Sequence, residues 1–216
     1  MYLGAGVKYT TVTDLMEPQE YLDLHTAVYR ELFRVTEPGG RVAVVVANID
    51  RKPYRHLTST HDDALAAVGF MQKGVVIWDK GPVFGTAWGS WLRPTNPELR
   101  DRHEYIIVAQ KPGSKPSKGL GDMISSEFTA ATQSIWTIQP ASAKRVKHPA
   151  PFPLEIPERL IKLYTYPSDL VLDPFNGSGT TCVAAERLGR RWIGVDMDPG
   201  YCELARSNLS KVVSTT

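Results

Sequence analysis

Two carboxylates and a run of glycine and hydroxyl residues stand close together near the carboxyl end of this 216-residue chain. The stretch VLDPFNGSGTT (171–181) has the pattern of an apolar strand, a turn that contains Gly177 and Gly179, and the start of a helix. Asp173 ends this strand, and Asp196 ends a second apolar stretch about twenty residues later. Glycines let a ligand approach the backbone closely, and carboxylates favour a ligand with a positive charge or with hydroxyl groups.

The residue types at the turn decide between several ligands. A phosphate-binding loop of the nucleoside-triphosphatase type needs a lysine after its last glycine, where this chain has Thr180. The dinucleotide fingerprint needs a third glycine where this chain has Cys182, and Asp173 would repel a pyrophosphate. S-adenosylmethionine fits better, with its ammonium at Asp173 and its ribose at Asp196. The open alternative is a tight turn without a ligand, in which Asp198 only caps the last helix.

Alternating apolar segments indicate the sheet that must position these residues. We predict helices over 18–35 and 62–68 and strands over 41–49, 75–80 and 104–111. Residues 81–101 look too broken by glycine, proline and tryptophan for regular structure, and 112–134 has the composition of an exposed loop or small insert. Strands that alternate with helices favour an α/β fold with a doubly wound, mostly parallel sheet.

Composition sets bounds on the function. The chain has 25 basic and 23 acidic residues, a net charge of +2, so a nucleic-acid partner must be argued from local charge. It has no apolar run of the roughly 20 residues that a membrane helix needs and no leader-like start, which favours a cytoplasmic location without a membrane partner. Its two cysteines, Cys182 and Cys202, are interpreted as reduced structural thiols, not as metal ligands or nucleophiles.

Taken together, several segments resemble the amino-group DNA methyltransferases, which modify adenine N6 or cytosine N4, in their permuted (beta-type) arrangement. DPFNGSGTT (173–181) is similar to the cofactor loop of that family, GVD (194–196) to its ribose-binding strand end, and HPAPFP (148–153) to the segment that borders the methionine moiety. EPGGRVAVVV, IWDKG and RHEYIIVAQKP resemble strands and turns of the catalytic half. The permuted order explains why the cofactor segment comes last in the chain.

The resemblance implies one Rossmann-like methyltransferase domain over 1–216 with S-adenosylmethionine as cofactor and no metal. Residues 1–111 would form the target-base half, 112–147 a short recognition segment, and 148–216 the cofactor-binding half. The implied activity is site-specific transfer of a methyl group to the exocyclic amino group of adenine or cytosine in DNA. The implied cofactor-binding residues are Asp173, Phe175, Asn176, Gly177, Ser178, Gly179, Thr180, Thr181, Asp196, Met197, His148 and Phe152.

The chain departs from the family in one respect that matters for catalysis. Members carry an Asp-, Ser- or Asn-Pro-Pro-aromatic motif on the strand before the first helix, and no such string occurs here. The nearest string, Lys52-Pro53-Tyr54, has one proline and follows another strand. The catalytic residues are therefore unknown, and we expect a fragment that lacks a central strand and has little activity. Alternatives are a non-catalytic cofactor- or DNA-binding subunit of a split enzyme and a methyltransferase for protein, RNA or small molecules.

Double-stranded DNA is the partner that the resemblance implies, together with a homodimer and a cognate restriction endonuclease as further candidates. Trp88 and Trp91 are candidates to line a DNA-facing cleft, although tryptophans beside glycines equally anchor loops to a core. Eight basic residues between 100 and 147 are candidate phosphate contacts, and for each of them a solvated face is the alternative: Arg100, Arg102, Lys111, Lys115, Lys118, Lys144, Arg145 and Lys147.

Overall fold

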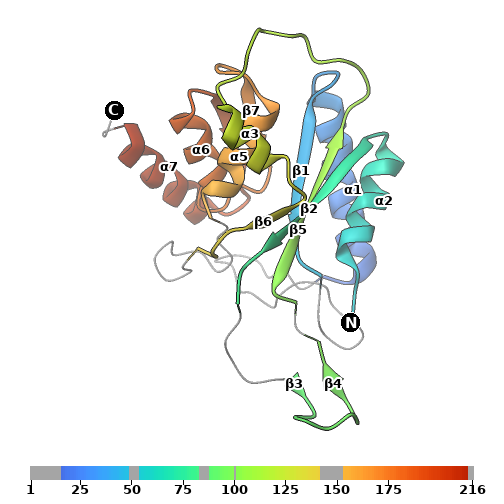
Figure 1. Cartoon of the computed structure of the whole chain (residues 1–216). Coiled ribbons are helices and arrows are strands. Elements are labelled where there is room, and N and C mark those ends of the chain that lie inside the picture. Colours follow the sequence, from blue (N-terminus) through green and yellow to red (C-terminus); the bar gives the residue numbers. More distant parts are fainter. Residues whose placement is uncertain (1–15, 49–53, 83–87, 100, 142–152, 214–216) are drawn as a thin grey trace.

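The computed structural model describes residues 16–48, 54–82, 88–99, 101–141 and 153–213, and Figure 1 shows an α/β arrangement of them. Helices α1 and α2 lie on one side of a four-stranded sheet, and the helices of the carboxyl-terminal half lie on the other side. The elements are α1 (Pro18–Val35), β1 (Arg41–Val46), α2 (Leu57–Val68), β2 (Met71–Asp79), β3 (Trp88–Gly89), β4 (Pro97–Glu98), β5 (His103–Gln110), α3 (Ser125–Ala131), β6 (Ile135–Thr137), α5 (Glu155–Tyr164), β7 (Leu170–Asp173), α6 (Thr180–Arg187), β8 (Arg191–Gly194) and α7 (Pro199–Val213).

Helix α1 has the bounds that the sequence predicts, because local signals mark both ends. Pro18 occupies the first turn, and the backbone N–H of Glu17 donates a hydrogen bond of 3.2 Å to the Glu20 carboxylate. Gly39, with φ of 78°, turns the chain towards β1. Helix α2 begins five residues before the predicted start, since its N-terminal neighbour His56 provides no side-chain cap that would have marked it.

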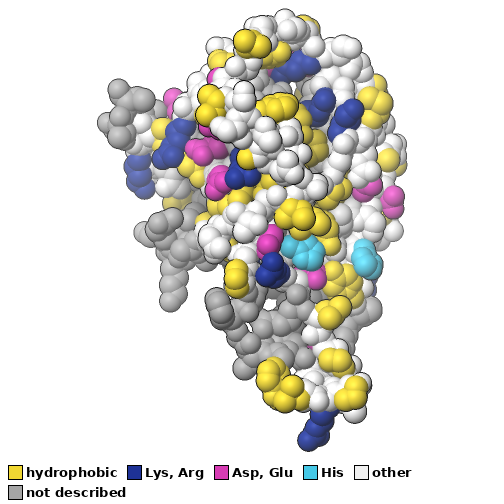
Figure 2. Space-filling model, in the orientation of Figure 1, with side chains coloured by type: hydrophobic (Ala, Val, Ile, Leu, Met, Phe, Trp, Pro, Cys, Tyr) yellow, Lys and Arg dark blue, Asp and Glu magenta, His cyan; other side chains and the backbone are white. Residues whose placement is uncertain are grey.

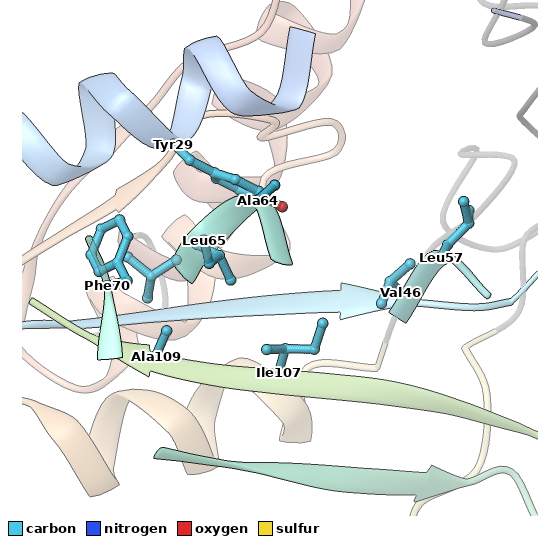
Figure 3. Close-up of a cluster of buried hydrophobic side chains, with 9 residues drawn as sticks. Tyr29, Val46, Leu57, Ala64, Leu65, Phe70, Ile107 and Ala109 are labelled. Atoms are coloured by element: carbon cyan, nitrogen blue, oxygen red, sulfur yellow. The ribbon is translucent and has the colours of Figure 1, made fainter. Parts of the chain in front are cut away.

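The four-stranded sheet has apolar side chains on both faces because its strands are nearly continuous apolar runs. On β5, Ile107 and Ala109 face α1 and α2, where they pack with Tyr29, Leu65 and Phe70 (Figure 3). The alternate residues Ile106 and Val108 face the opposite way and pack with Trp78, Trp136 and Ile156. Because successive side chains of a strand point to opposite faces, β5 contributes residues to the cores on both sides of the sheet.

The strands run β1–β5–β2–β6 across this sheet, and β7 and β8 form a separate parallel pair. Strand β5 is antiparallel to both β1 and β2, whereas β2 and β6 are parallel. The α/β architecture is confirmed, but the pairing is mixed because β5 runs against the other strands. Only the segment 80–102, which has no crossover helix among its described residues, connects β2 to β5, and such a connection suits antiparallel neighbours.

Two segments are more regular than the sequence predicts. Residues 88–98 form the short hairpin β3–β4, in which Trp88 pairs with Glu98 and Gly89 with Pro97, so the prediction of irregular structure was wrong there. Within the predicted loop or insert 112–134, residues 125–131 form α3. The turn of this hairpin is held by hydrogen bonds of the Ser90 hydroxyl. Such a turn lacks the glycine signal that the sequence analysis used to identify turns.

Ion pairs fasten the two halves together at one end of the sheet. Lys115 and Lys118 follow β5 and bind the Asp169 carboxylate, with a distance of 2.6 Å from Lys115 Nζ to Oδ2. Asp169 directly precedes β7, so β7 starts where β5 ends, beside the starts of β1 and β2. We call the opposite end, where β1, β2 and β7 all finish, the carboxyl end. In open α/β sheets, ligands bind at that end.

A second ion pair joins the same regions. The guanidinium of Arg190, fully buried, contacts both carboxylate oxygens of Asp122 and donates hydrogen bonds of 2.8 Å to the Thr165 carbonyl and 2.7 Å to the Leu188 carbonyl. A buried guanidinium is stable only when its donors are satisfied in this way. None of the helices described here has the length and apolar character needed to cross a membrane.

Candidate functional site

Strands β7 and β8 bring the two predicted carboxylates to neighbouring positions at the carboxyl end. Asp173 is paired with Gly194 in the parallel register. The pairing continues beyond the strands, because Val195 N donates to the Asp173 carbonyl at 2.9 Å and Asn176 N donates to the Val195 carbonyl at 2.9 Å. The turn after β7 is thus attached to the segment that carries Asp196.

The glycine turn adopts a conformation that few other residues tolerate. Gly177 and Gly179 have φ of 49° and 83°, in the left-handed region. Gly177 N donates a 2.7 Å hydrogen bond to Asp196 Oδ2, and Gly179 N donates to the Asn176 carbonyl at 2.8 Å. A Cβ at Gly179 would lie 2.8 Å from the Cβ of Ala205 on α7. The turn is therefore set by both the backbone and the close packing of a helix.

Gly194 belongs to this site although the sequence argument used it only within the GVD string. A Cβ at this position would lie 2.5 Å from Cγ of Asn176. The absence of a side chain lets the Asn176 amide lie against β8, where its Oδ1 also accepts a hydrogen bond of 3.1 Å from the Cys182 thiol. Burial raises the pKa of Cys182 to about 12, with the Asp173 charge as the second cause. This thiol is thus protonated and structural.

Electrostatics at the turn favour a positively charged ligand. Burial, chiefly, raises the pKa of Asp173, and the charge of Asp196 raises it further. Hydrogen bonds from Thr181 and from Phe175 N, the latter of 3.0 Å, act in the opposite direction. Within the described part of the chain, no cation is among the groups that shift this pKa. Two neighbouring carboxylates without a cation between them form a place where a positive group gains stability.

An aromatic stack from the other half of the chain contacts the turn, and sequence reasoning missed it. The His25 ring of α1 contacts the Tyr21 ring, at a centroid distance of 4.1 Å, and the Phe175 ring, at 5.7 Å, with interplanar angles of 34° and 31°. His61 of α2 meets His25 edge-on at 4.9 Å. More than half of the Phe175 side chain is exposed even so. No spacing within 171–181 could have indicated a partner so distant in sequence.

The remaining predicted residues have different environments. Ser178 is buried, and its carbonyl accepts a 3.0 Å hydrogen bond from Asn208 Nδ2 of α7, while its hydroxyl lies 3.4 Å from that of Thr180. Met197 is largely exposed beside Asp196. Asp198 is buried and accepts Gly200 N at 2.8 Å, so it caps α7 as the alternative interpretation expected. His148 and Phe152 lie outside the described residues.

Local basic charge gives less support for DNA binding than the sequence indicated. Lys115 and Lys118 bind Asp169, Arg102 binds Asp79 at 2.9 Å, and Lys111 Nζ donates to the Thr36 carbonyl at 2.8 Å. The other four candidates, Arg100, Lys144, Arg145 and Lys147, lie outside the described residues. The start of the predicted recognition segment, residues 112–118, lies at the end of the sheet opposite to the acidic turn.

Among the described residues, no group of His, Cys, Asp and Glu could hold a metal ion.

Comparisons with known proteins give consistent results. Residues 6–207 match the sequence profile of a family described as DNA methylase, N6_N4_Mtase. The chain is 29% identical over 206 residues to the type II methyltransferase M.MthZI of Methanothermobacter thermautotrophicus, covering 86% of this chain and 58% of that enzyme. It is 31% identical over 186 residues to the type II methyltransferase M.MjaI of Methanocaldococcus jannaschii, covering 79% of this chain and 61% of that enzyme. The chain thus spans less than two thirds of these relatives.

A solved structure resembles the fold over almost the whole chain. TTHA0409 of Thermus thermophilus, in complex with S-adenosyl-L-methionine, superimposes with a TM-score of 0.76 at 29% identity, over 92% of this chain and 80% of that one.

Proposed function

Because the chain belongs to the N6/N4 DNA methylase family, we propose that it transfers a methyl group from S-adenosyl-L-methionine to the exocyclic amino group of adenine or cytosine in DNA. One observation carries the proposal for this chain's own residues. The acidic turn at the carboxyl end places Asp173 and Asp196 side by side, with no cation acting on Asp173 among the described groups. The type II methyltransferases that it resembles and the cofactor bound to TTHA0409 support the assignment.

The residues present fit that cofactor. The ammonium of its methionine moiety would lie at Asp173, where it would relieve the repulsion from Asp196. The ribose hydroxyls would bind Asp196, whose Oδ2 and Oδ1 now accept Gly177 N and Asp198 N at 2.7 and 2.9 Å, so each oxygen keeps a lone pair free to accept another hydrogen bond. Phe175 and Met197 offer exposed apolar surface beside the two carboxylates. The other predicted loop residues hold the turn in shape.

When bound, S-adenosyl-L-methionine supplies an electrophilic methyl group on a sulfonium centre. The target nitrogen is conjugated with its ring and is therefore weakly nucleophilic. The protein must orient this amino group and accept hydrogen bonds from its two N–H bonds with a side-chain oxygen and a backbone carbonyl. The base must leave the duplex stack to reach such a site. Most of the rate enhancement then comes from positioning in line with the sulfonium.

Calorimetric titration with S-adenosyl-L-methionine and with its demethylated product tests the cofactor assignment without relying on turnover. We expect Asp196→Asn to weaken binding by about 10- to 100-fold, because hydrogen bonds to a charged acceptor contribute about 1.5–3 kcal/mol. Asp63→Asn, which changes an exposed carboxylate on α2, serves as the matched control and should bind as the unaltered chain does. Equal affinities for all three proteins, or no heat with the unaltered chain, would contradict the proposal.

A second candidate is supported by the open side of the β7–β8 pair. Leu170, Leu172, Ile193 and Val195 lie on one face of this pair, and their exposed fractions are between 37 and 51%. Doubly wound sheets normally cover such apolar faces with helices. Within the described residues, moreover, neither β7 nor β1 has a strand on its second edge. We propose that a further segment with a strand between β1 and β7 completes the sheet and carries the catalytic side chain.

This candidate makes the chain a cofactor-binding part whose active site is completed by a segment of another chain. Tyr54 does not replace the catalytic aromatic residue in this arrangement, because its hydroxyl donates to Asp101 Oδ2 at 2.6 Å and accepts from Asn48 Nδ2 at 3.1 Å. Transfer of a radiolabelled methyl group to DNA by this polypeptide alone, at about one turnover per minute, would refute it. A homodimer and a cognate restriction endonuclease are further partners that the proposed function implies.

A further inference from the structure

The hairpin β3–β4 extends beyond the carboxyl end of β2 and the starting end of β5, away from the layers of helix and sheet (Figure 1). Its connecting loop, residues 90–96, exposes Trp91 and Leu92 to 66 and 86%, and Leu99 just after β4 is exposed as well. Figure 2 shows hydrophobic side chains gathered at this far end, together with a basic side chain. Arg93 is the only charged residue between Ser90 and Asn96.

Specific hydrogen bonds hold the loop in one conformation. The Ser90 hydroxyl donates to the Arg93 carbonyl at 2.7 Å and accepts from Asn96 N at 2.8 Å, while Ser90 N donates to the Asn96 carbonyl at 2.8 Å. Leu92 has φ of 55°, which a residue with a branched side chain rarely adopts. Such a conformation persists only where the surrounding structure imposes it, and it is concentrated at functional sites. The loop therefore presents Trp91, Leu92 and Arg93 in a fixed arrangement.

The position of the hairpin indicates its partner. It projects from the carboxyl end, which also holds Asp173 and Asp196, whereas residues 112–118 of the predicted recognition segment lie at the opposite end. An enzyme that modifies a base must extract it from the helix, and proteins that distort a duplex insert apolar side chains between base pairs and hold the phosphates with cations. An exposed indole, a leucine and one arginine provide both kinds of group.

We propose that the β3–β4 hairpin is a DNA-binding element, in which Trp91 and Leu92 insert into the duplex beside the target base and Arg93 contacts a phosphate. This inference rests on the proposed function and adds to it the surface that engages the substrate. It also explains why an apolar tip is exposed at a point away from the two cores of the four-stranded sheet. The other occupant that could cover an exposed apolar tip is a second copy of the chain, and the experiment distinguishes the two.

Fluorescence anisotropy with a labelled short duplex of random sequence, at low ionic strength and with the demethylated cofactor present, is the test. Trp91→Ala should weaken binding about tenfold, since stacking on an aromatic side chain contributes about 1–3 kcal/mol per base. Leu92→Gly should weaken it severalfold and leaves the loop folded, because glycine adopts the left-handed backbone without strain. Arg93→Gln should lower the slope of log K against log salt by about one.

Leu120→Ala is the matched control, because Leu120 is 97% exposed but lies on the segment that crosses the opposite end of the sheet, so this variant should bind DNA as the unaltered chain does. Tryptophan fluorescence gives an independent readout. DNA should quench part of the emission of the unaltered chain, and this quenching should be smaller in Trp91→Ala, since Trp91 is 66% exposed whereas Trp78 and Trp136 are buried.

The results separate the two proposals. Unchanged DNA affinity in both Trp91→Ala and Leu92→Gly, or no DNA binding by the unaltered chain, would overturn the role of the hairpin while calorimetry still reports on the cofactor site. Dissociation of a dimer in Trp91→Ala, seen by sedimentation with DNA affinity unchanged, would assign the tip to self-association and would also overturn it. Absence of cofactor binding with a tenfold loss of DNA affinity would refute the methyl-transfer proposal and leave the hairpin a DNA-binding element.

Discussion

Lowering the pH from 7 to 5 should destabilise this protein through one buried histidine. The His61 side chain is only 3% exposed, and its Nε2 and Nδ1 form hydrogen bonds of 2.9 and 2.6 Å with the hydroxyls of Tyr21 and Tyr29. Burial, and next the neighbouring His25, lower the pKa of His61 from 6.5 to about 4. The two tyrosine hydroxyls can accept hydrogen bonds from both N–H groups of a charged His61 ring. The loss of hydration is therefore the main cost of charging this ring.

The direction and size of the effect follow from proton linkage. The unfolded chain binds a proton at His61 below pH 6.5, whereas the folded chain binds it only near pH 4. The free energy of unfolding therefore has its full value above pH 6.5 and decreases as the pH falls from 6.5 to 4. Between pH 7 and pH 5 the loss amounts to about 2 kcal/mol for this residue. His25, whose pKa burial also lowers, adds a loss of the same sign.

Urea unfolding at pH 7, 6 and 5 measures this loss, and the variant His61→Gln isolates it because glutamine does not titrate. The variant should be less stable at pH 7, yet it should lose about 2 kcal/mol less than the unaltered chain between pH 7 and 5. His56→Gln, at an exposed histidine, should keep the full dependence. Asp173, whose raised pKa acts in the opposite sense, is common to all three proteins. Parallel stability curves for His61→Gln and the unaltered chain would refute the reasoning.

Four further outcomes are expected. Gly179→Ala should lower the free energy of unfolding by about 2–3 kcal/mol in urea, because it adds strain at φ of 83° and a 2.8 Å contact with Ala205. His25→Ala should weaken calorimetric binding of the demethylated cofactor about fivefold, with His25→Phe close to the unaltered chain, since the ring stacks on Phe175. Cys182 should react with thiol reagents at pH 8 only after unfolding, because its pKa is raised to about 12. Asp169→Asn should cost about 2 kcal/mol at pH 7 in urea and progressively less as the pH falls below 3.8, since its two lysine partners hold the pKa of this carboxyl group well below 3.8 and the contribution disappears only once the folded chain protonates it.

Local signals in the sequence account for the parts of the fold and site that could be predicted. Helix α1 was predicted to the residue because Pro18 and the Pro-Gly-Gly run at 38–40 mark its ends. The acidic turn was predicted because its carboxylates and glycines are within a few residues of two strand ends. Sequence spacing is informative here since β7, the turn and α6 are consecutive and each contact is short in the chain.

The parts that were missed depend on contacts between distant residues or on unusual backbone. The contact of His25 with Phe175 joins residues from opposite halves of the chain, and no periodicity encodes it. The β3–β4 hairpin depends on the Ser90 hydroxyl, which is only a weak turn signal, and on a left-handed leucine, which is not a turn signal. The reversed direction of β5 could have been inferred, because the segment between β2 and β5 has no pattern of a crossover helix.

The ion pairs of Asp169 and Arg190 have a consequence for how the gene could be divided. These ion pairs join the segment after β5 to the residue before β7 and to the residues that follow α6. None of them involves a residue of the acidic turn. The ion pairs are non-covalent, and their residues lie on either side of 142–152 in the chain. Two polypeptides separated there should consequently recognise each other and reassemble, one with the four-stranded sheet and the other with the acidic turn. Under the proposed function, dividing the chain there would make cofactor binding and methyl transfer depend on the presence of both pieces.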